Sequence, residues 1–259
     1  MYSNNKSEII ITPPLYKMGR ICPAIRDNDR TKEVVWTYLV AKRYKKNLSA
    51  LVKCLCGCEE KLPDDPNIWL EAYLYPTQRL TEEEKYWKTR ADLAIGFLEN
   101  VPRRENQIRA KGDWLCIAES KWFDDIHKNS RFPETYQLSQ LIEHAILLSD
   151  INGEFPKRVY VSLITPRYFK ERLGQFSRNK VYQSKYECYK SDKKSLEDDL
   201  RLCTLHFNEG CDLETLISRI DALRLNWVTF EELLRLSNLV QDHIPGKYKV
   251  TRDNWVARL

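Results

Sequence analysis

The stretch from Arg90 to Trp122 constrains the fold of this chain more than any other part of its sequence. It contains two apolar segments, residues 92–98 and 113–119, separated by a polar and basic stretch of residues 99–112. Apolar runs of this length with turn-forming residues between them are typical of two strands of a hairpin. The sequence therefore predicts an antiparallel pair of strands that closes on the loop of residues 99–112.

Acidic and basic side chains come together at one end of this predicted hairpin. If the two strands pair around the loop, Asp92 lies opposite Glu119, and Leu98 lies opposite Asp113. Glu119 and Lys121 are two residues apart on one strand, so their side chains project from the same face. Two carboxylates and one amine would therefore meet where the hairpin begins and ends.

The composition indicates a soluble globular chain. It has 259 residues, of which 42% are hydrophobic and 31% are charged, which is ordinary for such proteins. No run of about 18 apolar residues is present, so we expect no membrane span. The N-terminus lacks the pattern of a signal peptide, so a cytoplasmic location is expected, with the eight cysteines mostly reduced.

Regular patterns on both sides of the hairpin predict an α/β fold. We expect helices over 31–56, 133–149, 195–207 and 213–225 and from Thr229 to about Gln241, and strands over 68–75, 158–164 and 226–228. This order fits a sandwich in which helices flank a mixed central sheet of about five strands. The whole chain, 1–259, is expected to form one domain with an N-terminal arm, 1–28, and a basic, helical insertion over about 167–225.

The predicted residue cluster suits metal-assisted hydrolysis of a phosphodiester. Hard divalent cations such as Mg²⁺ favour carboxylate and carbonyl oxygens and keep several waters, and such ions activate water and neutralise phosphate charge. Asp92, Glu119 and the peptide carbonyl of Ser120 are the expected metal ligands. Lys121 would orient or deprotonate the attacking water, or stabilise the transition state. Mg²⁺ is the expected cofactor, and Mn²⁺ is expected to substitute for it.

Asp92, followed 27 residues later by Glu119-Ser120-Lys121 on a second apolar strand, resembles the motif of the PD-(D/E)xK nuclease superfamily, the restriction-endonuclease-like fold. The resemblance covers roughly residues 30–165, and the proline of the motif is replaced here by Ala91. It implies a metal-dependent nuclease that hydrolyses DNA, with Asp92, Glu119 and Lys121 as catalytic residues. A homodimer is the assembly that double-strand cutting would favour.

The same resemblance suggests three further site residues. Many members place a glutamate in the first helix near the metal, and Glu33 occupies the matching position; alternatively, Glu33 only compensates the helix dipole. Some members place a glutamine on the helix after the motif, for which Gln137 and Gln140 are candidates. These two glutamines otherwise form a polar helix edge.

Two basic regions are candidates for contact with nucleic-acid phosphates. The window 167–194 contains nine Lys or Arg and three acids, a local charge of +6 in a chain whose net charge is +5. The candidate contact residues, from the hairpin loop and from this window, are Arg103, Arg104, Arg109, Lys111, Arg178, Lys180 and Lys185. The alternative for a run of charges is a solvated helix face.

Other functions remain open at this level. A non-catalytic nucleic-acid-binding or assembly subunit with the same fold is the main alternative to a nuclease, and an unrelated α/β protein with a fortuitous motif is another. Cys54, Cys56 and Cys58 invite a metal interpretation, but the second cysteine pair that zinc sites typically use is not evident.

Overall fold

The structure is a computed structural model. It describes residues 9–10, 37, 40, 44, 47–58, 66–74, 89–101, 107–121, 136–165, 167, 170, 180–203 and 213–236. The predicted arm is described only at Ile9–Ile10, which form a short strand, and the part of the chain beyond residue 236 lies outside the described residues.

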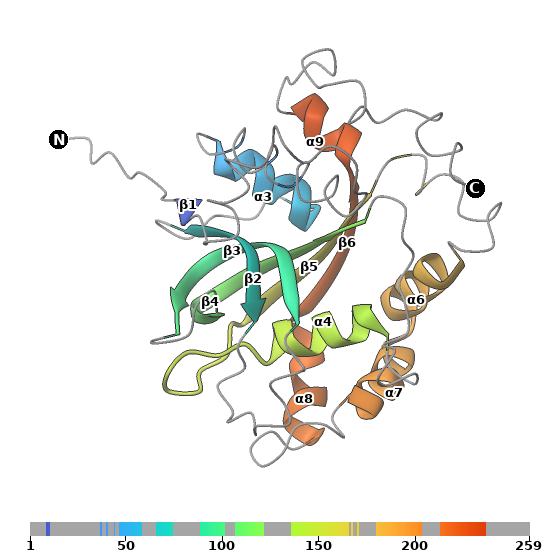
Figure 1. Cartoon of the computed structure of the whole chain (residues 1–259). Coiled ribbons are helices and arrows are strands. Elements are labelled where there is room, and N and C mark those ends of the chain that lie inside the picture. The colour runs from blue at the N-terminus through green and yellow to red at the C-terminus, as the bar shows by residue number, and fades with distance from the viewer. Residues whose placement is uncertain are drawn as a thin grey trace.

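A mixed six-stranded sheet forms the centre of the fold, as predicted for the class (Figure 1). In spatial order its strands are β1 (Ile9–Ile10), β2 (Asn67–Leu74), β3 (Arg90–Asn100), β4 (Gln107–Ser120), β5 (Arg158–Thr165) and β6 (Leu223–Thr229). The pairs β2–β3 and β3–β4 are antiparallel, whereas β4, β5 and β6 run parallel. The end of β2 also pairs with the start of β4, so these three strands curl round one another.

The hairpin of β3 and β4 keeps the predicted register only at its open end. Leu93 pairs with Ala118 and Gly96 with Leu115, a register that sets Asp92 against Glu119 as expected. The register then shifts between Gly96 and Leu98, so Leu98 pairs with Ala110. The predicted pairing of Leu98 with Asp113 is therefore wrong. The strands extend further than predicted and connect through residues 101–106 rather than 99–112.

The alternation of side chains between the two faces of the sheet is interrupted in β2 at Glu71. Ile68 and Leu70 pack in one hydrophobic cluster, whereas Ala72 and Leu74 pack in the cluster on the other side of the sheet. Glu71 has a positive φ of 55°, a left-handed conformation that costs a non-glycine residue about 1–2 kcal/mol. Because this one residue interrupts the alternation, the regular two-face pattern predicted for the strand holds only up to Leu70.

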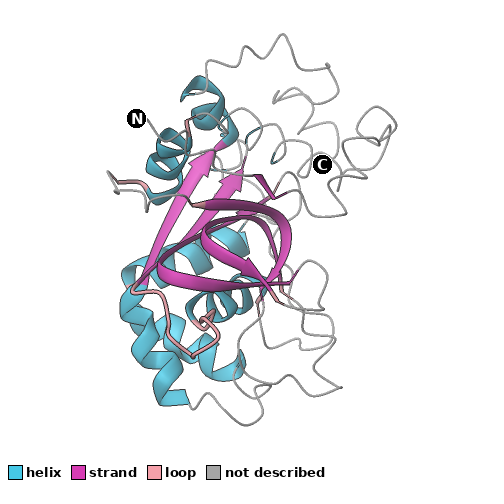
Figure 2. Cartoon of the chain, turned by 90° about the vertical axis from the view of Figure 1, so that its left-hand side faces the viewer, coloured by secondary structure: helices cyan, strands magenta, loops and turns pink. Residues whose placement is uncertain are grey.

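Helices cover both faces of the sheet, so the sheet lies between two hydrophobic layers (Figure 2). On one face lie α3 (Leu48–Cys56) and α9 (Phe230–Leu236). On the other lie α4 (Gln137–Ile146), α6 (Lys180–Ser191), α7 (Lys193–Cys203) and α8 (Leu213–Arg219), which continues as a short 3-10 helix, Ile220–Ala222. The basic window 167–194 therefore contributes α6, which packs against α7 within the helical layer.

The helix that precedes β2 is interrupted, in contrast to the continuous helix predicted over 31–56. Asn47 lies outside helical geometry and caps α3 by accepting a hydrogen bond from the backbone N–H of Ala50. The predicted end of the helix at residue 56 is confirmed, since Gly57 adopts the left-handed conformation that closes a helix. The side-chain amide of Asn226 donates to the carbonyls of Cys54 and Leu55, so β6 holds the C-terminal end of α3.

Pairing with β5 overrides local helical propensity before residue 226. The predicted helix over 213–225 ends in the 3-10 helix, because the chain joins β5 as a strand from Leu223 onward. At the other end of β6, Thr229 begins a helix as predicted and caps it in a capping box with Glu232. The hydroxyl of Thr229 accepts from the N–H of Glu232, and the Glu232 carboxylate accepts from the N–H of Thr229.

Candidate functional site

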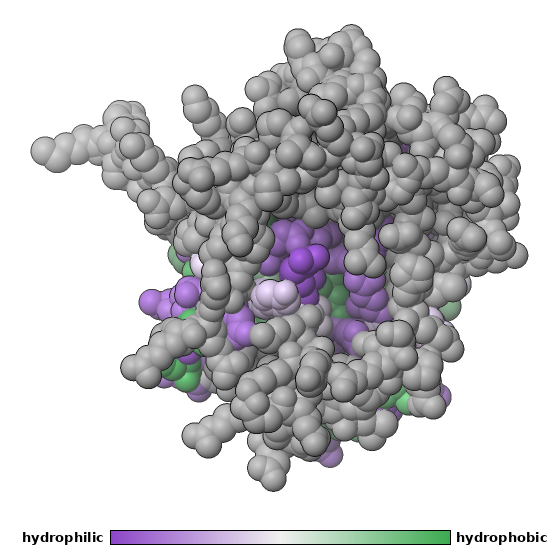
Figure 3. Space-filling view, in the orientation of Figure 1, coloured by the Kyte–Doolittle hydropathy of each residue, from purple (hydrophilic) through white to green (hydrophobic). Residues whose placement is uncertain are grey.

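The predicted site residues meet where β3 begins and β4 ends, beside the first turn of α4. In the view of Figure 3, the described residues visible at the centre of this side of the molecule are mainly hydrophilic. Asp92, Glu119 and Ser120 are all buried, and Lys121 is half-buried immediately after β4. The sequence prediction therefore identified a group of polar residues that the fold brings together in its interior.

Asp92 lies against the backbone of β4. The N–H of Ser120 donates a 2.6 Å hydrogen bond to Oδ2 of Asp92. Ser120 itself pairs with Ile164 of β5, and the N–H of Lys121 donates to the Ile164 carbonyl. The last backbone contacts of β4 are with β5, because β3 separates from β4 at this point. The Asp92 carboxylate therefore accepts the hydrogen bond of the Ser120 N–H.

Glu119 is held by two donors at one oxygen. Nζ of Lys121 lies 2.9 Å from Oε1 of Glu119, and Nε2 of Gln137 donates to the same oxygen at 3.0 Å. Gln137 is the first residue of α4, so this helix contributes directly to the site. Of the two candidate glutamines, Gln137 contacts the acidic motif. Gln140 lies one turn further along, where its carbonyl is 2.9 Å from Nδ1 of His144.

Glu71 and Arg90 join this site, although neither is among the site residues predicted from the sequence. Glu71 is 4% exposed, and its Oε2 lies 2.9 Å from Nε of Arg90. The negative charges of Glu71 and Glu119 also act on the Asp92 carboxyl group. The signal for this residue was a carboxylate inside an apolar strand, and the change of face at Glu71 could not be seen in the pattern.

The three carboxylates repel one another in a buried setting. Burial raises the pKa of Asp92 well above its ordinary value, and the charges of Glu119 and Glu71 raise it further. Burial also raises the pKa of Glu71, which Arg90 partly offsets. These acids therefore favour a cation or a proton among them. Three acids face two cations, Arg90 and Lys121.

The donor chemistry of this cluster suits a hard divalent cation. Its acidic side chains offer carboxylate oxygens, the ligands that Mg²⁺ prefers, and a bound cation would offset the repulsion among them. As they stand, no three acidic, histidine or cysteine side chains in the described residues are spaced to hold a metal ion. Metal binding would therefore require the Asp92 and Glu119 carboxylates to adjust toward a common point.

Ser120 is anchored on the opposite side of the sheet from this cluster. Its hydroxyl lies 2.8 Å from Oγ1 of Thr37, a helical residue that precedes α3, and both side chains are buried. This contact holds the peptide between Glu119 and Lys121, whose carbonyl is the predicted third metal ligand. Thr37 is a positioning residue that the sequence pattern did not single out.

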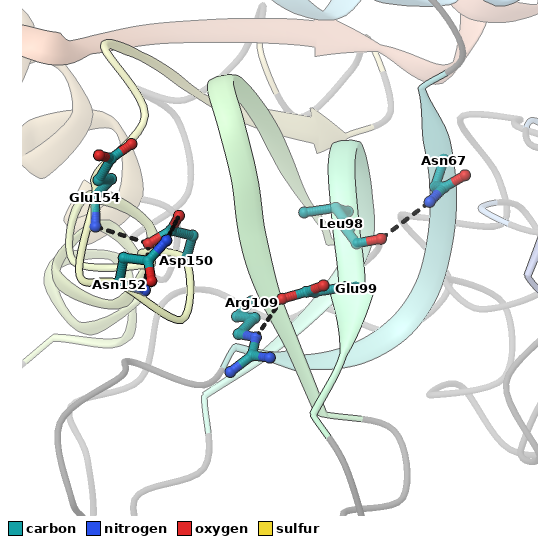
Figure 4. A network of polar contacts seen from close by, with 7 residues as sticks. All are labelled: Asn67, Leu98, Glu99, Arg109, Asp150, Asn152 and Glu154. Carbon is teal, nitrogen blue, oxygen red and sulfur yellow. Dashed lines mark hydrogen bonds and ion pairs between the residues drawn. The ribbon is translucent and has the colours of Figure 1, made fainter.

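The remaining predicted residues fall into two groups. Glu33, Arg103, Arg104 and Arg178 lie outside the described residues, as does the side chain of Lys180. Of the others, Lys111 is exposed on β4. Nε of Arg109 lies 2.5 Å from the Glu99 carboxylate near the hairpin turn (Figure 4). The amine of Lys185 lies 2.6 Å from the Asp199 carboxylate. Lys185 also lies over the ring of Tyr136, so it acts within the helical layer.

The three closely spaced cysteines do not form a metal site as they stand. Cys54 and Cys56 lie near the C-terminal end of α3 and Cys58 follows it, and all three are free thiols. Cys56 is buried, whereas Cys58 is exposed and lies 3.9 Å from the hydroxyl of Tyr160. Residues two apart on a helix point in different directions, which accounts for their separate environments.

No protein-family model, curated protein or solved structure matches this chain. Among its described helices, none is long and apolar enough to cross a membrane.

Proposed function

We propose that this protein is a metal-dependent nuclease of the restriction-endonuclease-like type that hydrolyses DNA phosphodiester bonds. The observation that carries the proposal is the meeting of Asp92, Glu119 and Lys121 at one end of the β3–β4 hairpin. These residues come from two strands and were selected by their motif alone. Their burial in a group with excess negative charge supports a role that an isolated surface motif would not have.

Asp92 and Glu119 would hold Mg²⁺, together with the carbonyl of Ser120. The bound ion would lower the pKa of a coordinated water and offset the charge that develops on the phosphate. Lys121 reaches Glu119 Oε1 at 2.9 Å, which supports a role in which its amine would hold the attacking water or donate to the phosphate. Gln137 keeps the Glu119 carboxylate oriented from the side of α4.

The direct test is cleavage of supercoiled, linear and single-stranded DNA with Mg²⁺, with Mn²⁺ and with a chelator. We expect cleavage with either metal and none with the chelator. Lys121→Ala should reduce the rate about 10²–10⁴-fold, the range for loss of a positioned acid–base group. Lys157→Ala is the matched control, because Lys157 is an exposed lysine just before β5, at the opposite end of the parallel strands from Ser120, and its removal should leave the rate of cleavage unchanged.

Two results would count against the proposal. Metal-dependent cleavage that persists in both Asp92→Ala and Lys121→Ala would show that the active site lies elsewhere. Salt-sensitive DNA binding without cleavage of any substrate would favour the non-catalytic binding subunit. Size measurements in solution with and without DNA test the expected homodimer.

A further inference from the structure

Arg90 is the one residue of this cluster that is both charged and open to solvent. Its side chain is 49% exposed, whereas those of Glu71, Glu119 and Lys121 are 5%, 6% and 11% exposed. It lies at the start of β3, two residues before Asp92, and pairs in register with Tyr73 of β2. A cation therefore stands at the outer edge of a group of buried acids.

Glu71 holds this cation by one nitrogen only. Nε of Arg90 lies 2.9 Å from Oε2 of Glu71, and its terminal amino groups bond to none of the described residues. The partner carboxylate is buried, so it cannot follow the arginine into solvent. A guanidinium anchored through Nε still presents its two terminal nitrogens, a planar fork that matches two oxygens of a phosphate.

The backbone conformation of Glu71 contributes to this arrangement. A positive φ at a non-glycine residue persists only where the surrounding structure compensates for its cost. At Glu71 the compensation includes the ion pair with Arg90. The strained residue therefore directs its carboxylate to the arginine.

We propose that Arg90 binds a backbone phosphate of the nucleic acid at the acidic cluster, with Glu71 as the positioning residue that aims its guanidinium. The inference rests on the proposed nuclease function, since it assigns the contact that brings phosphate to Asp92 and Glu119. The cluster carries an excess of negative charge and would repel a phosphodiester without such a cation. Arg90 is an exposed positive group two residues before Asp92 on β3.

The test is the salt dependence of DNA binding. A fluorescent 20-base-pair duplex is titrated with protein in metal-free buffer between about 50 and 200 mM salt, where no cleavage is expected. Each lost phosphate contact lowers the slope of log K against log salt by about 0.9. We expect Arg90→Ala to lower the slope by about that amount and to weaken binding about tenfold at the lowest salt. Arg90→Lys should retain the slope.

Arg224→Ala is the matched control, because Arg224 is an exposed arginine at the start of β6, at the opposite end of the parallel strands from Thr229. It should leave the slope unchanged. Removing Arg90 alone leaves Glu71 without its cation, so the double variant Glu71→Gln/Arg90→Ala is measured as well. In this double variant no unpaired carboxylate is left buried at residue 71. A cooperative thermal unfolding transition would show that the variant is folded.

The outcomes separate this inference from the proposed function. Equal slopes for wild type, Arg90→Ala and Arg224→Ala would overturn the role of Arg90, even if the wild type cleaves DNA. A wild type that binds no DNA would overturn it as well. A slope lowered only by removal of Arg90 would support the phosphate contact, even in a protein that cleaves nothing and so fails as a nuclease.

Discussion

The backbone N–H of Ser120 is hydrogen-bonded to the Asp92 carboxylate at 2.6 Å, across the point where β3 and β4 separate. A strand that leaves its neighbour exposes backbone donors, and a buried donor without a partner costs about 1–3 kcal/mol. Asp92 supplies that partner, and the charges of Glu119 and Glu71 act on the same carboxyl group. The structural and the proposed chemical role of Asp92 are therefore carried by one carboxyl group.

Magnesium should stabilise the fold through Asp92. A cation that binds only the folded state raises the free energy of unfolding by about 2.7 kcal/mol at a hundred times its dissociation constant. We expect the melting temperature to rise with Mg²⁺ concentration for wild type and to stay constant for Asp92→Asn. Without metal, Asp92→Asn should melt at the same or a higher temperature, since its amide oxygen still accepts from Ser120 and the repulsion is gone. Equal Mg²⁺ shifts for both proteins would show that the metal binds elsewhere.

Gln137 should affect the rate of DNA cleavage, whereas Gln140 should not. The Gln137 amide holds Glu119 Oε1, and loss of a residue that orients a metal ligand typically costs 10–100-fold. We expect Gln137→Ala to lower kcat in this range with little change in KM. Gln140→Ala, one turn along the same helix, is the control. An equal effect of the two substitutions on kcat would indicate a general disturbance of α4.

Lys185 should contribute to stability rather than to DNA binding. Its amine pairs with Asp199 at 2.6 Å and lies 4.3 Å from the centre of the Tyr136 ring, and the Asp199 side chain is 13% exposed. Removing the cation leaves a largely buried carboxylate, so Lys185→Met should lower the free energy of unfolding by about 1–3 kcal/mol in urea. Lys190→Met, an exposed lysine of the same helix, should change it by less than about 0.5 kcal/mol. A lowered salt slope of DNA binding with unchanged stability would instead assign Lys185 to phosphate contact.

Asn226 should stabilise the packing of α3 on the sheet. Its side chain donates to the carbonyls of Cys54 and Leu55. It also packs closely against Gly57, since a Cβ atom added to this glycine would lie 3.1 Å from the Asn226 side chain. We expect Asn226→Ala to lower the free energy of unfolding by about 1–2 kcal/mol, because the last turn of α3 loses both donors. Asn100→Ala, at the exposed end of β3, should have little effect. If the two variants unfold at the same urea concentration, water replaces Asn226 at the end of α3.

The elements that the sequence predicted well are those whose apolar pattern and local chemistry agree. The β3–β4 hairpin, the stop at Gly57 and the capping box of Thr229 and Glu232 depend on neighbouring residues, and the structure contains all three. The meeting of Asp92 with Glu119 was also predictable, because it needs only the register nearest the open end of the hairpin.

Features that depend on distant contacts were not predictable. The register shift after Gly96 follows from the curling of β4 toward β2, and the early start of β6 follows from its pairing with β5. The place of Glu71 in the site depends on a single left-handed residue that reverses the faces of β2. An alternating pattern contains no sign of such a reversal, since Ile68 to Leu74 fits a regular strand equally well.

Glu143 should make the protein less stable as pH rises. It lies on α4, is 2% exposed, and its Oε1 has no hydrogen-bond partner among the described residues. Burial raises its pKa well above the ordinary value of 4.5. Above that value the folded state retains a proton that the unfolded state releases, so the free energy of unfolding falls until pH passes the folded-state pKa.

Glu143→Gln removes this titration while keeping nearly the same shape. We expect the variant to match wild type near pH 4 and to be more stable at pH 8, by about 1.4 kcal/mol for each unit by which the pKa is raised. Urea unfolding of both proteins at several pH values measures the difference. Glu154→Gln, an exposed glutamate in the turn after α4, controls for the loss of one negative charge. A difference between wild type and Glu143→Gln that shrinks with rising pH would show that Glu143 is ionised and paired in the folded protein.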